Sequence, residues 1–160
     1  MNTETLSPGC NVTIDEIAEL KRTLGGKVLT EGESYESARK VWNGMIDRKP
    51  AVIIQSRNSD DVIQAMKFAR QHKLVVSVKG GGHNVAGNAV CEGLMIDLSK
   101  MKEIKVDPEK RTATAEPGVL WKEFDAATQE HLLATTGGTV SDTGIAGLTL
   151  GGCLGALMAK

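Results

Sequence analysis

The segment from residue 51 to residue 78 constrains the fold of this chain more than any other. Residues 51–55 (AVIIQ) and 74–78 (LVVSV) are short apolar runs rich in branched side chains, which are typical of buried strands. Between them, Ser59 or Asp60 can cap a helix, and its apolar face is expected to comprise Val62, Ile63, Met66 and Ala69. A strand, helix, strand unit favours two parallel strands joined by a right-handed crossover. The sequence therefore predicts an α/β layer here.

Three consecutive glycines, Gly80, Gly81 and Gly82, follow the second of these strands and lie between Lys79 and His83. Ligands of α/β proteins tend to bind at the carboxyl ends of strands, where this loop is expected. Glycine admits positive φ and lets a ligand approach the peptide plane, and consecutive amides in such a turn can bind phosphate oxygens. On glycine content alone, a pair of tight turns explains the loop equally well.

A second glycine-rich stretch covers residues 135–155, with seven glycines and no Lys, Arg or Glu. Neither stretch has the spacing of a common nucleotide-binding loop. Val85 stands where a GxGxxG motif has its third glycine, and the Gly26-Lys27 pair is followed by Val28 rather than by Ser or Thr. A Rossmann dinucleotide site and a P-loop are both disfavoured, so any phosphate ligand is expected to be held by another fold.

The rest of the chain contains further signals for helices and strands. Thr13 and Glu16 form a capping-box pattern that predicts a helix over residues 13–24. Strands are expected at residues 94–98 and 112–115, with a turn at residues 107–110 between them. A further helix is predicted over residues 120–130, with Leu120, Phe124 and Ala127 on one face.

Composition excludes several classes of function. The chain has 160 residues, 41% of them hydrophobic, and a net charge of −1, so it offers no overall field to attract nucleic acid or an anionic membrane. The N-terminus lacks the basic and apolar regions of a signal peptide, so a cytoplasmic location is expected. Cys10, Cys91 and Cys153 are odd in number and widely spaced, which indicates neither a disulfide framework nor a zinc site.

The motif Lys79-Gly80-Gly81-Gly82-His83-Asn84, with Gly87 after it and Gly151-Gly152-x-x-Gly155 downstream, resembles the flavin domain of a known family. The family is that of FAD-linked oxidases of the berberine-bridge-enzyme and 6-hydroxynicotine-oxidase type, whose flavin domain is shared with vanillyl-alcohol oxidase and p-cresol methylhydroxylase. Residues 35–43 and 115–118 extend the likeness, which covers residues 25–160.

The resemblance implies an α+β fold in which two small α/β subdomains hold FAD between them. It divides the chain into a helical lead-in, residues 1–30, and an FAD-binding domain, residues 31–160, that is incomplete at its C-terminus. The substrate-binding domain of the family is expected to lie outside this sequence. The sequence does not define the oligomeric state.

FAD is the cofactor that the resemblance implies, with the loop around its pyrophosphate and His83 covalently joined to the flavin 8α-methyl. The implied cofactor-binding residues are Lys79, Gly80, Gly81, Gly82, His83, Asn84, Gly87, Val140, Ser141, Thr143, Gly144, Gly147, Leu148 and Gly151. Lys79 stands where arginine is more usual, and its side chain is expected to be exposed. Val140 occupies the position at which some relatives carry a second attaching cysteine, so a single attachment is expected. Cys153 replaces a glycine of the later run.

The expected function is that of an oxidase, in which hydride passes from a small organic substrate to FAD and then to dioxygen, giving hydrogen peroxide. No catalytic residue and no metal ligand is assigned, and the isolated chain is expected to be inactive. Two alternatives stay open: a module that binds FAD or another nucleotide without turnover, and a structural fragment without cofactor. Trp42, Trp121 and Phe124 are expected to be packing residues, and Asp142 to have a structural role. Valine at Gly81 or Gly82 is expected to abolish cofactor binding while the fold survives.

Overall fold

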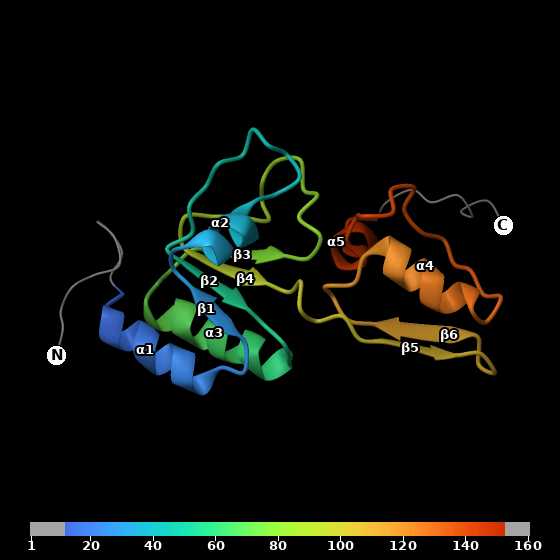
Figure 1. The fold of residues 1–160 in the computed structure, drawn as a ribbon, viewed down its shortest axis with the longest axis horizontal. Helices are drawn as coiled ribbons and strands as arrows, with labels where there is room; N and C mark the ends of the chain where they lie inside the picture. The colour runs from blue at the N-terminus through green and yellow to red at the C-terminus, as the bar shows by residue number, and fades with distance from the viewer. Residues whose placement is uncertain (1–11, 153–160) are drawn as a thin grey trace.

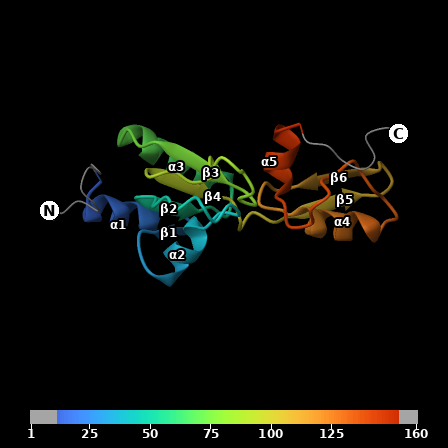
Figure 2. The same ribbon diagram turned by 90° about the horizontal axis from the view of Figure 1, so that it is seen from above.

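The computed structural model describes residues 12–152, which form two lobes side by side (Figures 1 and 2). The first lobe contains α1 (Ile14–Thr23), β1 (Lys27–Leu29), α2 (Glu33–Arg39), β2 (Val52–Gln55), α3 (Ser59–Gln71), β3 (Val76–Lys79) and β4 (Leu94–Asp97). The second lobe contains β5 (Ile104–Asp107), β6 (Thr112–Ala115), α4 (Trp121–Gln129) and α5 (Ile145–Leu150). Helices and strands occur in both lobes, as expected for the α+β class.

The sheet of the first lobe has the strand order β1-β2-β4-β3. Strands β2 and β3 both pair in parallel with β4, whereas β1 runs antiparallel to β2. The parallel arrangement predicted for the strand, helix, strand unit is therefore confirmed. The insertion of β4 between its two strands was not foreseen, and it leaves β3 at the edge of the sheet.

Helices cover both faces of this sheet, with α1 and α3 on one face and α2 on the other (Figure 1). Side chains alternate between the faces of a strand, so Ile54 and Ile96 join the core beneath α1 and α3. Ile53 and Met95 instead pack with Tyr35 of α2. These four strand residues are at most 1% exposed, and complete burial of such a side chain contributes about 1.5–3 kcal/mol.

The edge position of β3 corrects two expectations. The run at residues 74–78 is not a buried strand, because Val75 is 70% exposed and Val78 is 53% exposed. The predicted apolar face of α3 is also only partly right, since Ile63 and Met66 are about half exposed. The residues of α3 that are buried are Asp61, Ala65, Phe68 and Ala69.

The predicted N-terminal helix is present as α1, with the Thr13–Glu16 capping box formed. Its Ile17 and Leu20 belong to the same buried cluster as Ile54 of β2. Within this structure α1 is thus part of the first lobe, while the division of the chain between residues 30 and 31 stays a prediction.

The second lobe is built on the antiparallel pair β5–β6, against which α4 packs. The predicted strand at 112–115 and the predicted helix at 120–130 are confirmed, whereas β5 was not foreseen. Trp121 anchors α4 and is 5% exposed, so its expected packing role is correct.

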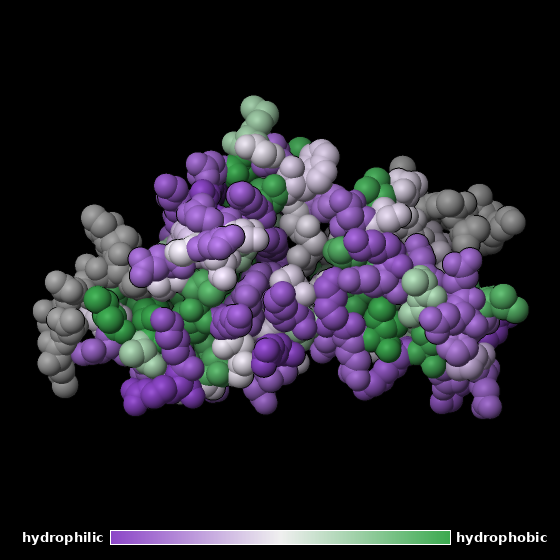
Figure 3. Space-filling model, in the orientation of Figure 1, coloured by the Kyte–Doolittle hydropathy of each residue, from purple (hydrophilic) through white to green (hydrophobic). Residues whose placement is uncertain are grey.

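The visible face of both lobes is mainly hydrophilic, with smaller hydrophobic patches among the polar residues (Figure 3). Among the helices of residues 12–152, none has the length and apolar character needed to cross a membrane.

Candidate functional site

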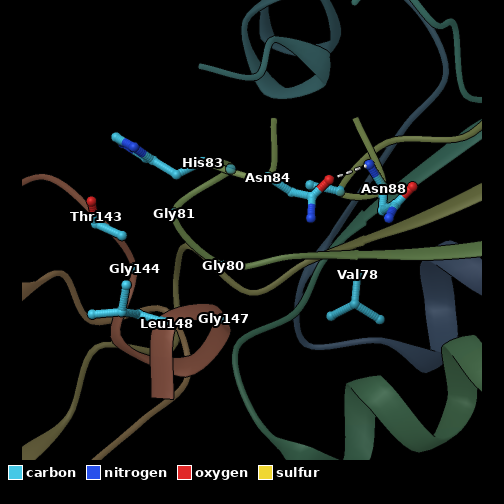
Figure 4. A pocket seen from close by; sticks show the side chains of 12 residues that line it. Val78, Gly80, Gly81, His83, Asn84, Asn88, Thr143, Gly144, Gly147 and Leu148 are labelled. Atoms are coloured by element: carbon cyan, nitrogen blue, oxygen red, sulfur yellow. Dashed lines mark hydrogen bonds between the residues drawn. The ribbon is translucent and has the colours of Figure 1, made fainter. Parts of the chain in front are cut away.

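A cavity of about 340 Å³ lies where the glycine loop after β3 faces residues 143–148 of the second lobe (Figure 4). Both lobes contribute to its wall, so the cavity exists only when they pack together. The lining residues are Val78, Gly80, Gly81, Gly82, His83, Asn84, Asn88, Ala89, Thr143, Gly144, Gly147 and Leu148.

Close backbone contact between the lobes explains part of the glycine content. A Cβ atom on Gly81 would lie 2.3 Å from the backbone nitrogen of Gly144, and a Cβ atom on Gly80 would lie 3.1 Å from the carbonyl oxygen of Pro117. No side chain fits at Gly81 unless the lobes move apart. A valine at this position would therefore disrupt the contact between the two lobes. The expectation that the fold survives this substitution is wrong for that part of the structure. Gly147 differs, because a Cβ atom there would meet nothing within 4 Å.

The backbone of the loop presents a row of unused hydrogen-bond donors. Within residues 12–152, the amide groups of residues 80–84 donate to no protein acceptor. Successive backbone amides in a turn can bind an anion when they point inward, and Gly82, with a φ of +73°, provides such a turn here. An amide buried away from water requires a partner; Gly82 is the buried residue of this loop, and a phosphate group would supply a partner for its amide.

Asn84 and Gly87 shape the turn that follows. Asn84 accepts hydrogen bonds from the amides of Gly87 (3.0 Å) and Asn88 (2.9 Å), the second through its side-chain oxygen (Figure 4). Gly87 has a φ of +78°, and a Cβ atom on it would lie 2.9 Å from the side chain of Ile46. Gly87 thus supports the loop from behind and does not line the cavity.

Lys79 is neither exposed nor directed into this cavity, which corrects the expectation from the sequence. Its ammonium group donates to the carbonyl oxygens of Ala38 (2.5 Å), in the last turn of α2, and of Lys40 (2.9 Å), which follows that helix. Burial lowers the pKa of this ammonium group below its ordinary value of 10.5, and the nearby Asp97 carboxylate partly offsets that effect. Lys79 therefore ties the glycine loop to the chain that leaves α2.

The imidazole of His83 contacts side chains from both lobes. The indole of Trp42 stacks on it, with ring centroids 5.7 Å apart and planes inclined by 23°. Nε2 of His83 lies 3.7 Å from a carboxylate oxygen of Asp142. Trp42 is 62% exposed, so it is not the packing residue expected from the sequence.

The structure brings together nine of the fourteen residues implied for cofactor binding, all of which line the cavity. The five that do not are Lys79, Gly87, Val140, Ser141 and Gly151. Sequence reasoning missed Val78, Asn88, Ala89, Trp42 and Asp142. Residues 35–43, which contain Trp42, carried part of the family likeness, and this was the signal that could have directed attention to it.

Within residues 12–152, no group of three or more His, Cys, Asp or Glu residues is arranged to hold a metal ion. Cys91 is half-buried, with its Sγ 3.4 Å from the carbonyl oxygen of Val75. Cys10, Cys153 and Gly155 lie outside the described residues.

Comparison with known proteins gives one consistent result. A family model described as "FAD binding domain" matches residues 50–160. The FAD-linked oxidoreductase pgmH of Aspergillus terreus is 32% identical over 148 residues, which cover 89% of this chain and 30% of that protein. The (R)-6-hydroxynicotine oxidase of Paenarthrobacter nicotinovorans is 28% identical over 140 residues, which cover 86% of this chain and 31% of that protein.

A solved structure gives the same answer for the fold. The crystal structure of 6-hydroxy-D-nicotine oxidase from Arthrobacter nicotinovorans superposes with a TM-score of 0.76 at 26% identity, covering 78% of this chain and 28% of that one. The chain thus spans about a third of the length of the relatives that it matches. It belongs to the FAD-binding-domain family, which it shares with FAD-linked oxidoreductases such as 6-hydroxynicotine oxidase, and its cofactor is FAD.

Proposed function

We propose that the cavity between the lobes binds the pyrophosphate of FAD, and that the chain is the FAD-binding part of an oxidase. The observation that carries this proposal is the run of five amide groups at residues 80–84 that have no acceptor within residues 12–152, in a glycine loop that follows β3 and lines the cavity. Such donors hold phosphate oxygens without a charged side chain. This accounts for a phosphate site in which Lys79 is engaged elsewhere.

The residues present fit part of an FAD molecule. The cavity of about 340 Å³ is in the range of small-ligand sites. Gly147 leaves room beside the cavity, since nothing lies within 4 Å of the place of its missing side chain. Leu148 and Val78 supply apolar walls, and Thr143 and Asn88 supply polar groups.

His83 is the residue that attaches the cofactor. Its side chain is 19% exposed and lines the cavity beside the free amides, so it is accessible to a ligand while held in place. A neutral imidazole is a nucleophile near neutral pH. Val140 offers no thiol for a second bond, so attachment is single.

In catalysis, bound FAD supplies a two-electron acceptor that takes hydride from a small organic substrate and passes the electrons to dioxygen. The residues described here bind and orient the cofactor and help to exclude water from it. The substrate reaches the flavin through a part of the protein that is not among these residues. The oxidase activity of the relatives named above supports this assignment by similarity.

The visible absorption spectrum of the purified protein tests the proposal. Flavin bands in the protein, and their persistence on the polypeptide after denaturation, are expected for the parent. His83→Ala is expected to bind FAD but to release all of it on denaturation. A parent protein that binds no FAD would overturn the cofactor site. Equal retention of flavin by His83→Ala after denaturation would overturn the attachment. Because the chain alone is expected to be inactive, peroxide formation is measured in protein that also contains the substrate-binding part. Bound flavin there with no peroxide from any alcohol, amine or sugar would favour a binding module over an oxidase.

A further inference from the structure

The His83 imidazole is contacted by one aromatic and one acidic side chain, and neither of them belongs to the glycine loop. Trp42 lies in the connection between α2 and β2 of the first lobe, and Asp142 lies just before α5 in the second. The indole is nearly parallel to the imidazole, at 23° and with centroids 5.7 Å apart. The Asp142 carboxylate lies 3.7 Å from Nε2.

Trp42 is held in place by the backbone around it. Its amide donates to the carbonyl oxygen of Gly82 (3.0 Å), and the side-chain amide of Asn43 donates to the carbonyl oxygen of Val85 (2.8 Å). The Lys79 ammonium binds two carbonyl oxygens just before Trp42, as described above. These contacts hold the backbone of the segment beside the loop, and the indole, which is 62% exposed, stacks on the imidazole from there. Stacking of this kind contributes about 0.5–1.5 kcal/mol beyond burial.

Asp142 acts on His83 through its charge. A distance of 3.7 Å is too long for a hydrogen bond, but a carboxylate so close to Nε2 favours the tautomer with its proton on that nitrogen. Nδ1 then keeps its lone pair. Metal-binding histidines show the same effect: the group that contacts one ring nitrogen holds the proton there and leaves the other nitrogen free to bind the metal.

We propose that Trp42 and Asp142 are positioning residues for flavin attachment: Trp42 fixes the plane of the His83 imidazole, and Asp142 keeps the proton on Nε2, so that Nδ1 forms the bond. The inference rests on the proposed function, because it concerns how His83 reaches the cofactor. It assigns roles to two residues outside the glycine loop, one of them from the opposite lobe.

The chemistry of attachment gives Asp142 a second contribution. One C–H bond of the flavin 8α-methyl and one N–H bond of the imidazole are replaced by the new N–C bond. The two electrons released pass through the flavin to dioxygen, which leaves with the two protons as hydrogen peroxide. While Nδ1 bonds to carbon before Nε2 loses its proton, the ring is cationic, and the adjacent carboxylate stabilises that charge.

The experiment measures covalent attachment of flavin over time. The chain is purified, freed of reversibly bound flavin and then incubated with FAD. The variants are Asp142→Asn, Trp42→Ala and Trp42→Phe, with Asp125→Asn and Met45→Ala as matched controls at exposed positions. Three quantities are measured: the affinity for reversibly bound FAD, the rate at which flavin becomes resistant to denaturation, and the bonded nitrogen, by NMR of the flavin peptide.

Asp142→Asn and Trp42→Ala are expected to slow attachment by about tenfold or more, as loss of a partner that orients histidine does in metal sites. Reversible FAD affinity should change by no more than about twofold, as for a surface substitution. Trp42→Phe should restore most of the rate. The parent should carry the bond at Nδ1, and Asp142→Asn should shift part of it to Nε2.

The outcomes separate this inference from the proposed function. A parent without denaturation-resistant flavin would overturn the attachment itself, and with it the roles given to both residues. A parent that attaches flavin at Nε2, or variants that attach it at the rate of the parent, would overturn the positioning roles alone. The positioning roles would also be overturned if Asp142→Asn and Trp42→Ala slowed attachment no more than the Asp125→Asn and Met45→Ala controls do.

Discussion

At the scale of the residue, the glycines that line the cavity have different functions, and substitution separates them. Gly81→Ala places a methyl group 2.3 Å from the Gly144 nitrogen, as the geometry of the missing Cβ shows. Overpacking of this kind costs about 1–3 kcal/mol, and the displaced loop should bind FAD more weakly. Urea unfolding and FAD titration measure the two effects.

Gly147→Ala is the matched control, because its added methyl group meets nothing within 4 Å and lies in α5. An alanine in a helix is more favourable than glycine by up to about 1 kcal/mol, so this variant should be at least as stable as the parent. Equal stability of the Gly81 and Gly147 variants would contradict the close contact between the lobes.

Asp61 shows how a single buried carboxylate joins secondary-structure elements. It is 3% exposed and accepts hydrogen bonds from the amides of Gly25 and Arg57, both at 2.8 Å. Asp61→Asn puts an NH₂ group against one of these donors and removes the charge, which should lower the free energy of unfolding by about 1.5–3 kcal/mol. Chemical denaturation measures the loss. Asp60 is the exposed neighbour of Asp61, so Asp60→Asn is the control. A similar loss of unfolding free energy in Asp60→Asn would contradict the role assigned to Asp61.

At the scale of the element, the capping box at the start of α1 should make stability depend on pH. The backbone amide of Thr13, and then its hydroxyl, hold the pKa of Glu16 below its ordinary value of 4.5, with burial opposing them and His72 adding a smaller effect. A carboxyl group with a lowered pKa stabilises the fold above its ordinary pKa. That contribution is lost as the pH falls through its value in the folded state.

Glu16→Gln should therefore be less stable than the parent at about pH 7, and the difference should narrow by about pH 2, as the pH falls below 4.5 and through the lowered pKa of the parent carboxyl group. Since the Glu16 side chain is 39% exposed, the gap at neutral pH should not exceed about 1 kcal/mol. Urea midpoints at the two pH values measure it, with Glu31→Gln correcting for the change in net charge. A gap that widens on acidification would exclude the capping role.

At the scale of the whole molecule, FAD should stabilise the arrangement of the two lobes. Their backbones meet at Gly81 and Gly144 beside the cavity, so a ligand bound there contacts both. At a free concentration of one hundred times Kd, reversible binding should add about 2.7 kcal/mol to the free energy of unfolding. Differential scanning fluorimetry detects the shift. Riboflavin, which lacks the pyrophosphate, is the control, and stabilisation by riboflavin equal to that by FAD would contradict a pyrophosphate site in the loop.

Local patterns in the chain were sufficient to predict α1, β2, α3, β4, β6 and α4, because periodicity and capping act between residues a few positions apart. The same holds for the loop between Lys79 and Asn84, since strand end, glycine run and histidine are consecutive. The family motif in this loop was sufficient to identify FAD as the cofactor. The predictions that were wrong concern places where segments far apart in the sequence come into contact.

Only the tertiary structure decided which residues surround the imidazole and which strand is at the edge. The insertion of β4 next to β2 exposed Val75 and Val78, although their sequence is that of a buried strand. Trp42 reaches His83 because Lys79 and Gly82 hold its segment, and Asp142 does so because Gly144 packs on Gly81. These contacts join positions far apart along the chain. They follow from the packing of two lobes, which no pattern confined to a single segment encodes.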